Sequence, residues 1–269
     1  MELLSALYSI HAPTGAEWEM ILFIRNYLAR FVPEASCRMD AWGNLYITKG
    51  APVLSLAPGE ASGYPTLACH MDQVQTLHSS DFEVREDAGI LYGWSELGQH
   101  REGVGADDKN GIWICLKCLR KFPSLKVFMS VGEEKGCIGS NRADMAFFSD
   151  SFYVIEPDSK EAAAVKVVLR GIPCASDAFV SAMKVEEHGY QLVEGKTTDI
   201  LPLTISGLGV SCANVSAGYY SPHKDEEFTV VSDLMRSLAY IEELLSSLRR
   251  RFPHLYISET QKHIEQLLI

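Results

Sequence analysis

Five short segments between residues 70 and 223 carry the side chains best suited to chemistry. They are His70-Met71-Asp72, the glycine-bracketed Asp107-Asp108, Glu133-Glu134, Asp158 and His223. Taken singly, each has an ordinary alternative, such as a hydrogen-bonded core histidine or an acidic helix N-cap. Taken together, two histidines and several carboxylates form the ligand set that zinc, cobalt or manganese prefers over thiolates. The sequence therefore predicts a site for divalent metal ions.

Spacing within these segments suggests individual roles. Residues two apart on a strand face the same way, so Asp72 can accept a hydrogen bond from the His70 ring nitrogen that a metal does not use. Glu133 and Glu134 follow an apolar run directly. Adjacent carboxylates at a buried strand end repel each other, which indicates either a cation between them or one protonated partner.

Charge balance favours two metal ions. If Asp107 bridges two divalent ions, with Glu134 on one and Asp158 on the other, the bound ions keep a net positive charge. That charge lowers the pKa of a bridging water and polarises a carbonyl. Glu133 then stays unligated next to this water, as the general base.

The elements that must position these residues alternate along the chain. Helices are expected near residues 2–10 and 16–30, followed by a hairpin that turns at Gly43-Asn44 and a loop over residues 50–63. After the loop, expected strands alternate with expected helices; the strands cover 65–72, 125–134 and 151–158, and the helices cover 108–122 and 139–148. This alternation predicts an α/β fold with a mostly parallel, mixed central sheet flanked by helices.

The C-terminal half continues with a strand at 165–172, a helix near 176–187, a strand at 201–208 and a long helix over roughly 229–250. Three of the earlier strands end in the acidic or imidazole side chains, and open parallel sheets bind ligands beyond the carboxyl ends of their strands. No repeat, low-complexity linker or change in composition marks a boundary. The sequence therefore predicts a single catalytic domain over residues 1–269.

Composition excludes some classes of protein. With 24 Lys and Arg against 35 Asp and Glu, the formal net charge is −11, which argues against nucleic-acid binding. No apolar stretch approaches the roughly 18 residues of a membrane span, and the apolar start lacks a basic flank, so no membrane partner is expected. Seven scattered cysteines fit reduced thiols better than disulfides, and together these features favour a cytoplasmic protein.

In order and type, the motifs H-x-D, G-A-D-D-K-x-G, E-E, a lone Asp and a final His resemble those of the co-catalytic dizinc peptidases. That family includes peptidase T, carboxypeptidase G and the aminoacylases. The resemblance covers residues 1 to about 250, and the opening APTGAE and the hairpin D-x-x-GN are also similar to that family's start. It implies the zinc-dependent exopeptidase-like fold, of the phosphorylase/hydrolase-like type. It also implies two divalent ions, zinc first, with cobalt or manganese as alternatives.

The resemblance also implies a role for each matching residue. His70 and Asp158 are implied to be terminal metal ligands, Asp107 the bridging ligand, and Glu134 and His223 the residues that complete the two sites. By the same resemblance, Asp72 orients His70, Glu133 is the general base, and the Asp107–Asp108 peptide bond is cis.

One departure from the family sets further expectations. Only 65 positions separate Asp158 from His223, where enzymes of the peptidase T type insert a lid domain, so this chain is more similar to the lidless dizinc aminopeptidases. We therefore expect a tyrosine near His223, Tyr219 or Tyr220, to donate a hydrogen bond to the developing oxyanion in place of a lid residue.

The same short connection has a single arginine, Arg170, for a substrate carboxylate, whereas its acids Asp177 and Asp199 could pair with a substrate ammonium. The leading hypothesis is therefore an aminopeptidase that acts on small peptides. An amidase, deacylase or carboxypeptidase on the same scaffold is an alternative, and a non-catalytic binding module with a vestigial metal site is a minor one. Side-chain preference, the native metal and the oligomeric state stay open.

Overall fold

A nine-stranded mixed sheet forms the centre of the protein in the computed structural model, which describes residues 1–257. Its strands are β1 (Ser36–Met39), β2 (Leu45–Lys49), β3 (Tyr64–His70), β7 (Leu125–Ser130), β8 (Ser151–Ser159), β9 (Ala164–Leu169), β10 (Ile172–Pro173), β11 (Gln191–Gly195) and β12 (Cys212–Ser216). They are ordered β1-β2-β7-β3-β8-β12-β9-β10, and β11 pairs with β9. The four central strands β7, β3, β8 and β12 are parallel, whereas β1, β2, β9 and β10 pair antiparallel towards the edges.

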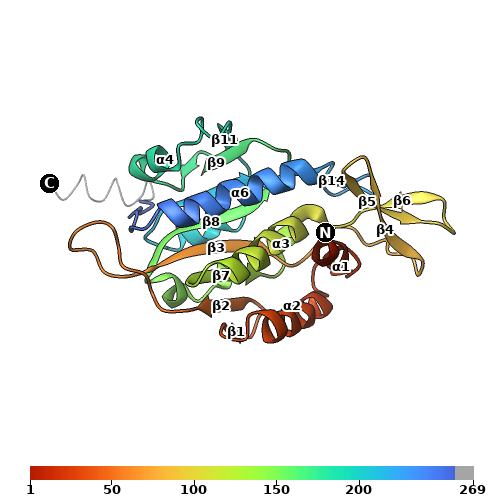
Figure 1. Cartoon of the computed structure of the whole chain (residues 1–269), viewed down its shortest axis with the longest axis horizontal. Coiled ribbons are helices and arrows are strands. Elements are labelled where there is room, and N and C mark those ends of the chain that lie inside the picture. Colours follow the sequence, from red (N-terminus) through yellow and green to blue (C-terminus); the bar gives the residue numbers. More distant parts are fainter. Residues whose placement is uncertain (258–269) are drawn as a thin grey trace.

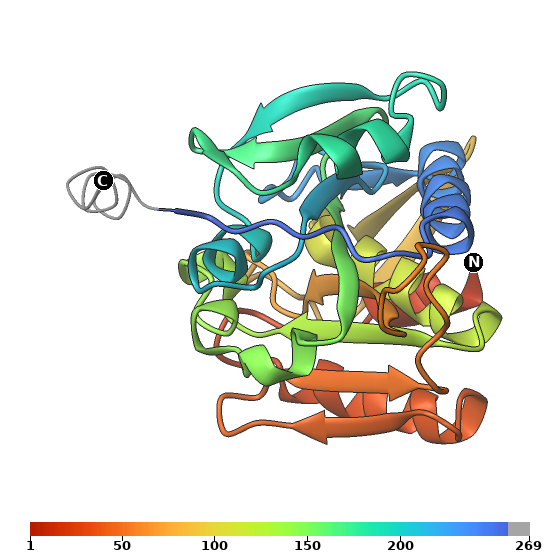
Figure 2. The same cartoon turned by 90° about the vertical axis from the view of Figure 1, so that its left-hand side faces the viewer.

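Helices cover both faces of this sheet, as Figure 2 shows for α6 and α5 on opposite sides. The helices are α1 (Glu2–Tyr8), α2 (Trp18–Phe31), α3 (Ala106–Lys121), α4 (Asp177–Met183), α5 (Ile200–Ile205) and α6 (Val231–Ser247). The larger apolar core packs α1, α2, α3, α4 and α6 against one face, and a smaller core places α5 against the other. The predicted fold class, a mostly parallel α/β sheet flanked by helices, is confirmed.

A second, five-stranded sheet projects from one end of the molecule (Figure 1). Its strands are β4 (Phe82–Asp87), β5 (Ile90–Ser95), β6 (His100–Glu102), β13 (Tyr219–Tyr220) and β14 (Phe228–Val230). The β4–β5 hairpin turns at Ala88-Gly89, where both residues have positive φ, as a type I′ turn requires. Pairing of β14 with β5 anchors the segment that carries His223, although no strand was predicted at β4, β5 or β6.

Two predicted elements are wrong. Residues 201–208 form no strand, because α5 occupies residues 200–205; Pro202 lies in its first turn, where the missing N–H has no helical partner to lose. Residues 139–148 form no α-helix either. They form two short 3-10 turns, η2 (Ser140–Arg142) and η3 (Met145–Phe148), separated by Ala143 in an extended conformation.

Other predicted elements are present in the structure. These are the two opening helices, the hairpin with its turn before Leu45, the helix that ends at Met183 and the long helix α6. All seven cysteines are free. No separate lid domain lies within the described residues, nor does any helix there have the length and apolarity to cross a bilayer. The single domain predicted over residues 1–269 includes residues 258–269, which lie outside the described part.

Candidate metal centre

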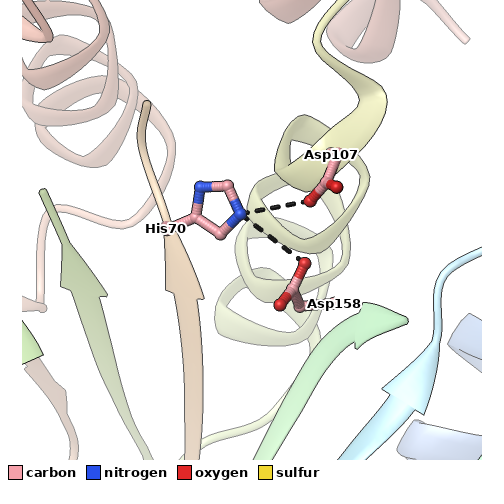
Figure 3. A group of neighbouring side chains, drawn as sticks. All are labelled: His70, Asp107 and Asp158. Carbon is pink, nitrogen blue, oxygen red and sulfur yellow. Dashed lines mark hydrogen bonds and ion pairs between the residues drawn. The ribbon is translucent and has the colours of Figure 1, made fainter. Parts of the chain in front are cut away.

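The sequence-predicted ligands meet at the carboxyl edge of the parallel strands. His70 is the last residue of β3, Asp158 lies at the end of β8, and Asp107 lies at the start of α3. Glu134 belongs to a 3-10 turn, η1 (Glu133–Lys135), just after β7, and His223 follows β13. Figure 3 shows the His70 ring with Asp107 and Asp158 on the same side. Side chains from five separate segments thus converge on one place.

Asp107 lies between the two histidines, and each of its carboxylate oxygens faces a different ring. Oδ1 is 3.2 Å from Nε2 of His70, and Oδ2 is 3.2 Å from Nε2 of His223. The same His70 nitrogen is 3.6 Å from Oδ1 of Asp158, and the same His223 nitrogen is 3.0 Å from Oε1 of Glu134. The arrangement therefore divides into two half-sites that share Asp107.

The donor atoms fit divalent cations. Within each half-site the ligand atoms lie within 4.8 Å of one another, and a third group of this kind joins His70, Glu133 and Glu134. Oε1 of Glu134 is buried and accepts no hydrogen bond, since its approach to His223 lacks hydrogen-bond geometry. A buried carboxylate oxygen without a donor is costly. A cation held between these oxygens and imidazole nitrogens would satisfy it.

Burial and the crowding of carboxylates also shift the pKa values of the groups at the centre. Burial, and then the neighbouring Asp107 charge, raise the pKa of Asp158 to about 7. Burial lowers the pKa of His70, but hydrogen bonds to Asp107, Asp158 and Asp72 outweigh it and raise that pKa well above its ordinary value. The carboxylates of Asp107 and Glu134 beside the ring raise the pKa of His223 to about 10. In the absence of a metal, the crowded carboxylates hold protons on the histidines, and a cation would take the place of those protons.

Asp72 connects three segments around the centre. The His70 Nδ1 nitrogen lies 3.1 Å from the backbone oxygen of Asp72 and 3.4 Å from its carboxylate. That carboxylate also accepts hydrogen bonds from the backbone N–H groups of Glu133 and Glu134, at 2.9 and 3.2 Å, and from the Thr14 hydroxyl at 2.7 Å. Asp72 thus holds the turn that carries Glu133 and Glu134 as well as the histidine.

Sequence reasoning missed three residues that support the centre. The Thr14 hydroxyl binds Asp72, and the Glu17 carboxylate accepts hydrogen bonds from the N–H groups of Gly15 and Gly132, next to Glu133. The opening motif APTGAE contained both residues and gave a signal for them. Glu227, which is fully buried, accepts from the N–H groups of Ala106 and Asp107 at 2.9 and 3.4 Å, and no motif pointed to it.

Asp108 is buried beneath the centre, and within the described residues its carboxylate accepts hydrogen bonds from backbone N–H groups alone. Its carboxylate accepts from the N–H groups of His70 (3.3 Å) and Gly111 (2.9 Å). Gly111 has to be a glycine because a Cβ there would lie 2.3 Å from Asp108 Oδ1. The Asp107–Asp108 peptide bond is cis, as the family resemblance implies.

A cavity of about 590 Å³ opens over the centre. Its lining includes Asp107, Glu133, Glu134, Asp158 and His223. Tyr219 lines it as well, with its hydroxyl donating to the backbone oxygen of Asp158 at 3.2 Å. A volume of this size suits a small-molecule or short-peptide ligand.

Three residues expected to bind substrate lie outside the lining of this cavity. The Tyr220 hydroxyl donates to Asp233 at 2.7 Å. Asp199 is fully buried, and its carboxylate accepts from the hydroxyls of Ser130 and Ser140 instead of facing the cavity. Asp177 is exposed at the start of α4. The structure therefore brings none of these three to the metal centre.

Comparison with solved structures identifies the fold. The aminopeptidase PepT from Bacillus cereus superposes with a TM-score of 0.69 at 13% identity, covering 91% of this chain and 96% of that one. A tripeptidase from Staphylococcus aureus gives 0.69 at 13% identity, with 92% and 97% covered. An aminopeptidase from the archaeon Desulfurococcus kamchatkensis gives 0.65 at 17% identity, with 91% and 93% covered. At such identities the likeness establishes the fold, which is that of these solved peptidases.

No protein-family model matches the chain, and no curated protein matches it in sequence.

Proposed function

We propose that this chain is a single-domain metallo-exopeptidase, an aminopeptidase that hydrolyses small peptides with the help of two divalent metal ions. Zinc is the first candidate for these ions. The position of Asp107, with one carboxylate oxygen towards each of two histidines, is the observation that carries the proposal. The peptidase fold and the cavity over the centre support it.

The residues of each half-site would hold one ion. His70 and Asp158 would bind the first, Glu134 and His223 the second, and Asp107 both. When bound, such a pair of ions supplies Lewis acidity, which polarises a peptide carbonyl and lowers the pKa of water. Asp72 keeps the His70 ring and the Glu133–Glu134 turn in place through the contacts described above.

Glu133 is proposed to be the general base. It lines the cavity beside the ligand groups, and the one hydrogen bond that its side chain accepts within residues 1–257 comes from the weak thiol donor of Cys137, at 3.5 Å. Burial and then the neighbouring Asp158, Asp199 and Glu134 carboxylates raise the pKa of Glu133 to about 10, against the opposing effect of the His70 charge. Cations in the half-sites would counter that repulsion. Glu133 could then take a proton from the attacking water and deliver it to the leaving amine.

Acetylation of the substrate's amino terminus tests whether the site recognises the amino end or the carboxyl end of the peptide. Glu133 lines the metal side of the cavity and is not a proposed metal ligand, so its carboxylate is available to a substrate ammonium. We expect that acetylating one peptide lowers kcat/KM at least about 30-fold, the scale of losing a charge pair worth about 2 kcal/mol. The measurement compares free and acetylated forms of the same peptide. Equal kcat/KM would reject the aminopeptidase and favour the deacylase or carboxypeptidase alternative.

Tyr219 is the tyrosine we propose for oxyanion stabilisation, because it lines the cavity beside Asp158, and its hydroxyl would exchange the backbone oxygen of Asp158 for the oxyanion as acceptor. Tyr219→Phe is expected to lower kcat by on the order of 10²-fold, as loss of an oxyanion donor does elsewhere. Tyr220→Phe is the matched control, since its hydroxyl contacts Asp233. Unchanged kcat at saturation in Tyr219→Phe would refute this role.

A further inference from the structure

The cavity is lined by cations as well as by carboxylates. Lys160, Lys166 and Lys196 all contribute to its wall. Lys160 forms an ion pair with Glu161 at 2.9 Å. Within residues 1–257, neither Lys166 nor Lys196 has a carboxylate oxygen within 4.0 Å of its ammonium nitrogen, the limit for an ion pair. Two cavity ammonium groups are therefore without an anionic partner in the described protein.

Acids nearby do not serve as partners for these lysines. Glu161, which lines the same cavity, is paired with Lys160, and the carboxylate of Glu194 accepts a hydrogen bond from the N–H of Gly171 at 2.9 Å. The remaining cavity carboxylates belong to the metal centre and its general base. An anion for Lys166 would have to come from a ligand.

Lys166 is half-buried, and the local structure makes room for its stem. It lies on β9, and its side chain passes over Gly195 of β11. A Cβ at Gly195 would come within 2.7 Å of Lys166 Cδ, so a larger residue there would displace the lysine. Packing of the stem restricts its rotamers, which reduces the entropy lost when the ammonium binds an anion.

Sheet register gives the distance of Lys166 from β8, the strand that carries Asp158. Lys166 pairs with Asn214 of β12, and Asn214 pairs with Glu156 of β8, so all three side chains share one face of the sheet. Asp158 lies on the same side, since the Asn214 amide donates to the carboxylates of both Glu156 and Asp158, at 3.0 and 3.4 Å. Two strand spacings place the Lys166 backbone about 10 Å from that of Glu156. An extended peptide covers this distance with about three residues.

From these contacts we propose that Lys166, assisted by Lys196, binds a carboxylate of the substrate two or three residues from the cleaved bond. The preferred substrates are then short peptides that carry a carboxylate at that distance. The carboxylate is either the peptide's own C-terminus or an acidic side chain. This inference rests on the proposed peptidase function and defines the class of peptide that the site takes.

Four peptides separate the two sources. Ala-Ala-Ala is compared with its C-terminal amide, and Ala-Ala-Asp-amide with Ala-Ala-Asn-amide, by kcat/KM and by calorimetric binding to the metal-loaded protein. A preference of about 10- to 100-fold for the charged member, the scale of a hydrogen bond to a charged group, is expected in one pair. The first pair identifies the C-terminal carboxylate and the second an acidic side chain. Equal values in both pairs would overturn the proposal.

Variants at position 166 connect the preference to the lysine. Lys166→Met keeps the stem and removes the charge, so it is expected to abolish the preference, with kcat/KM of the charged member falling to that of its uncharged partner. Lys166→Arg is expected to restore it in part. Lys184→Met is the control, because Lys184 is exposed outside the cavity and pairs with Glu187. A preference that survives in Lys166→Met would rule out this residue.

Calorimetry keeps the two proposals separate. If no peptide is cleaved but the charged members bind more tightly in a Lys166-dependent manner, the peptidase proposal fails and the carboxylate site stands. If all four peptides are cleaved and bound equally, the carboxylate site fails and the peptidase proposal stands.

Discussion

Replacing Glu133 by Gln is expected to lower kcat at least about 10²-fold, because the variant cannot accept a proton from the attacking water. Bound metal is expected to stay near the wild-type level, since Glu133 is not among the ligands proposed for either half-site. Gln has the same length as Glu, so the turn held by Asp72 should be preserved. Steady-state kinetics together with metal analysis of the same sample check both expectations.

Glu134→Gln is the matched comparison, because the two residues are adjacent in one 3-10 turn. Loss of the Glu134 carboxylate is expected to weaken metal affinity, by removing a ligand beside His223. Raising the metal concentration should then restore part of its activity, but none of the activity of Glu133→Gln. Equal metal loss in both variants, with no further loss of turnover, would show the two roles to be misassigned.

Chelation is expected to abolish activity, and zinc, cobalt or manganese to restore it. The carboxylates of Asp107 and Asp158 are buried beside one another, and without cations only protonated His70 and His223 offset their charge. Metal analysis should give about two ions per chain, because the geometry divides into two half-sites. A lower Tm is expected for the metal-free protein, since ions that bind only the folded state stabilise it.

Full activity in a thoroughly demetallated sample would contradict the two-metal proposal. Magnesium offers a control for specificity, because it binds oxygen ligands and the half-sites each include an imidazole. Restoration by magnesium alone would argue against the ligand assignment.

The candidate ligands could be predicted because their spacing reflects strand ends. His70 and Asp158 end central strands and Glu134 follows another, so the parallel sheet brings them together. The substrate-binding residues could not be predicted in this way. Asp199 is adjacent to a pocket residue in sequence, yet its carboxylate is directed into the core towards Ser130. The sequence argument considered an arginine as the partner of a substrate carboxylate and therefore did not include Lys166. The position of Lys166 depends on the pairing of β9 with β12.

Strand β12 could not be predicted from the local sequence either. No strand was predicted over residues 212–216, which include the polar Asn214 and Ser216, but β12 is a fully buried central strand. Its polar side chains have partners there: Asn214 donates to Glu156 at 3.0 Å, and Ser216 donates to the Lys160 backbone. Such long-range hydrogen bonds make polar residues acceptable in a core and leave no pattern in the local sequence.

The position of β12 also determines when the central sheet can close during synthesis. β12 is the last strand of the central sheet to be translated, yet it lies between β8 and β9. The roughly 50 residues between β8 and β12 take about 3 to 10 s to make at about 5–20 residues per second. During that interval one edge of β8, whose residues are all buried in the finished protein, has no partner. His223 emerges still later, so the nascent chain holds an incomplete, acidic metal site until after its sheet can close.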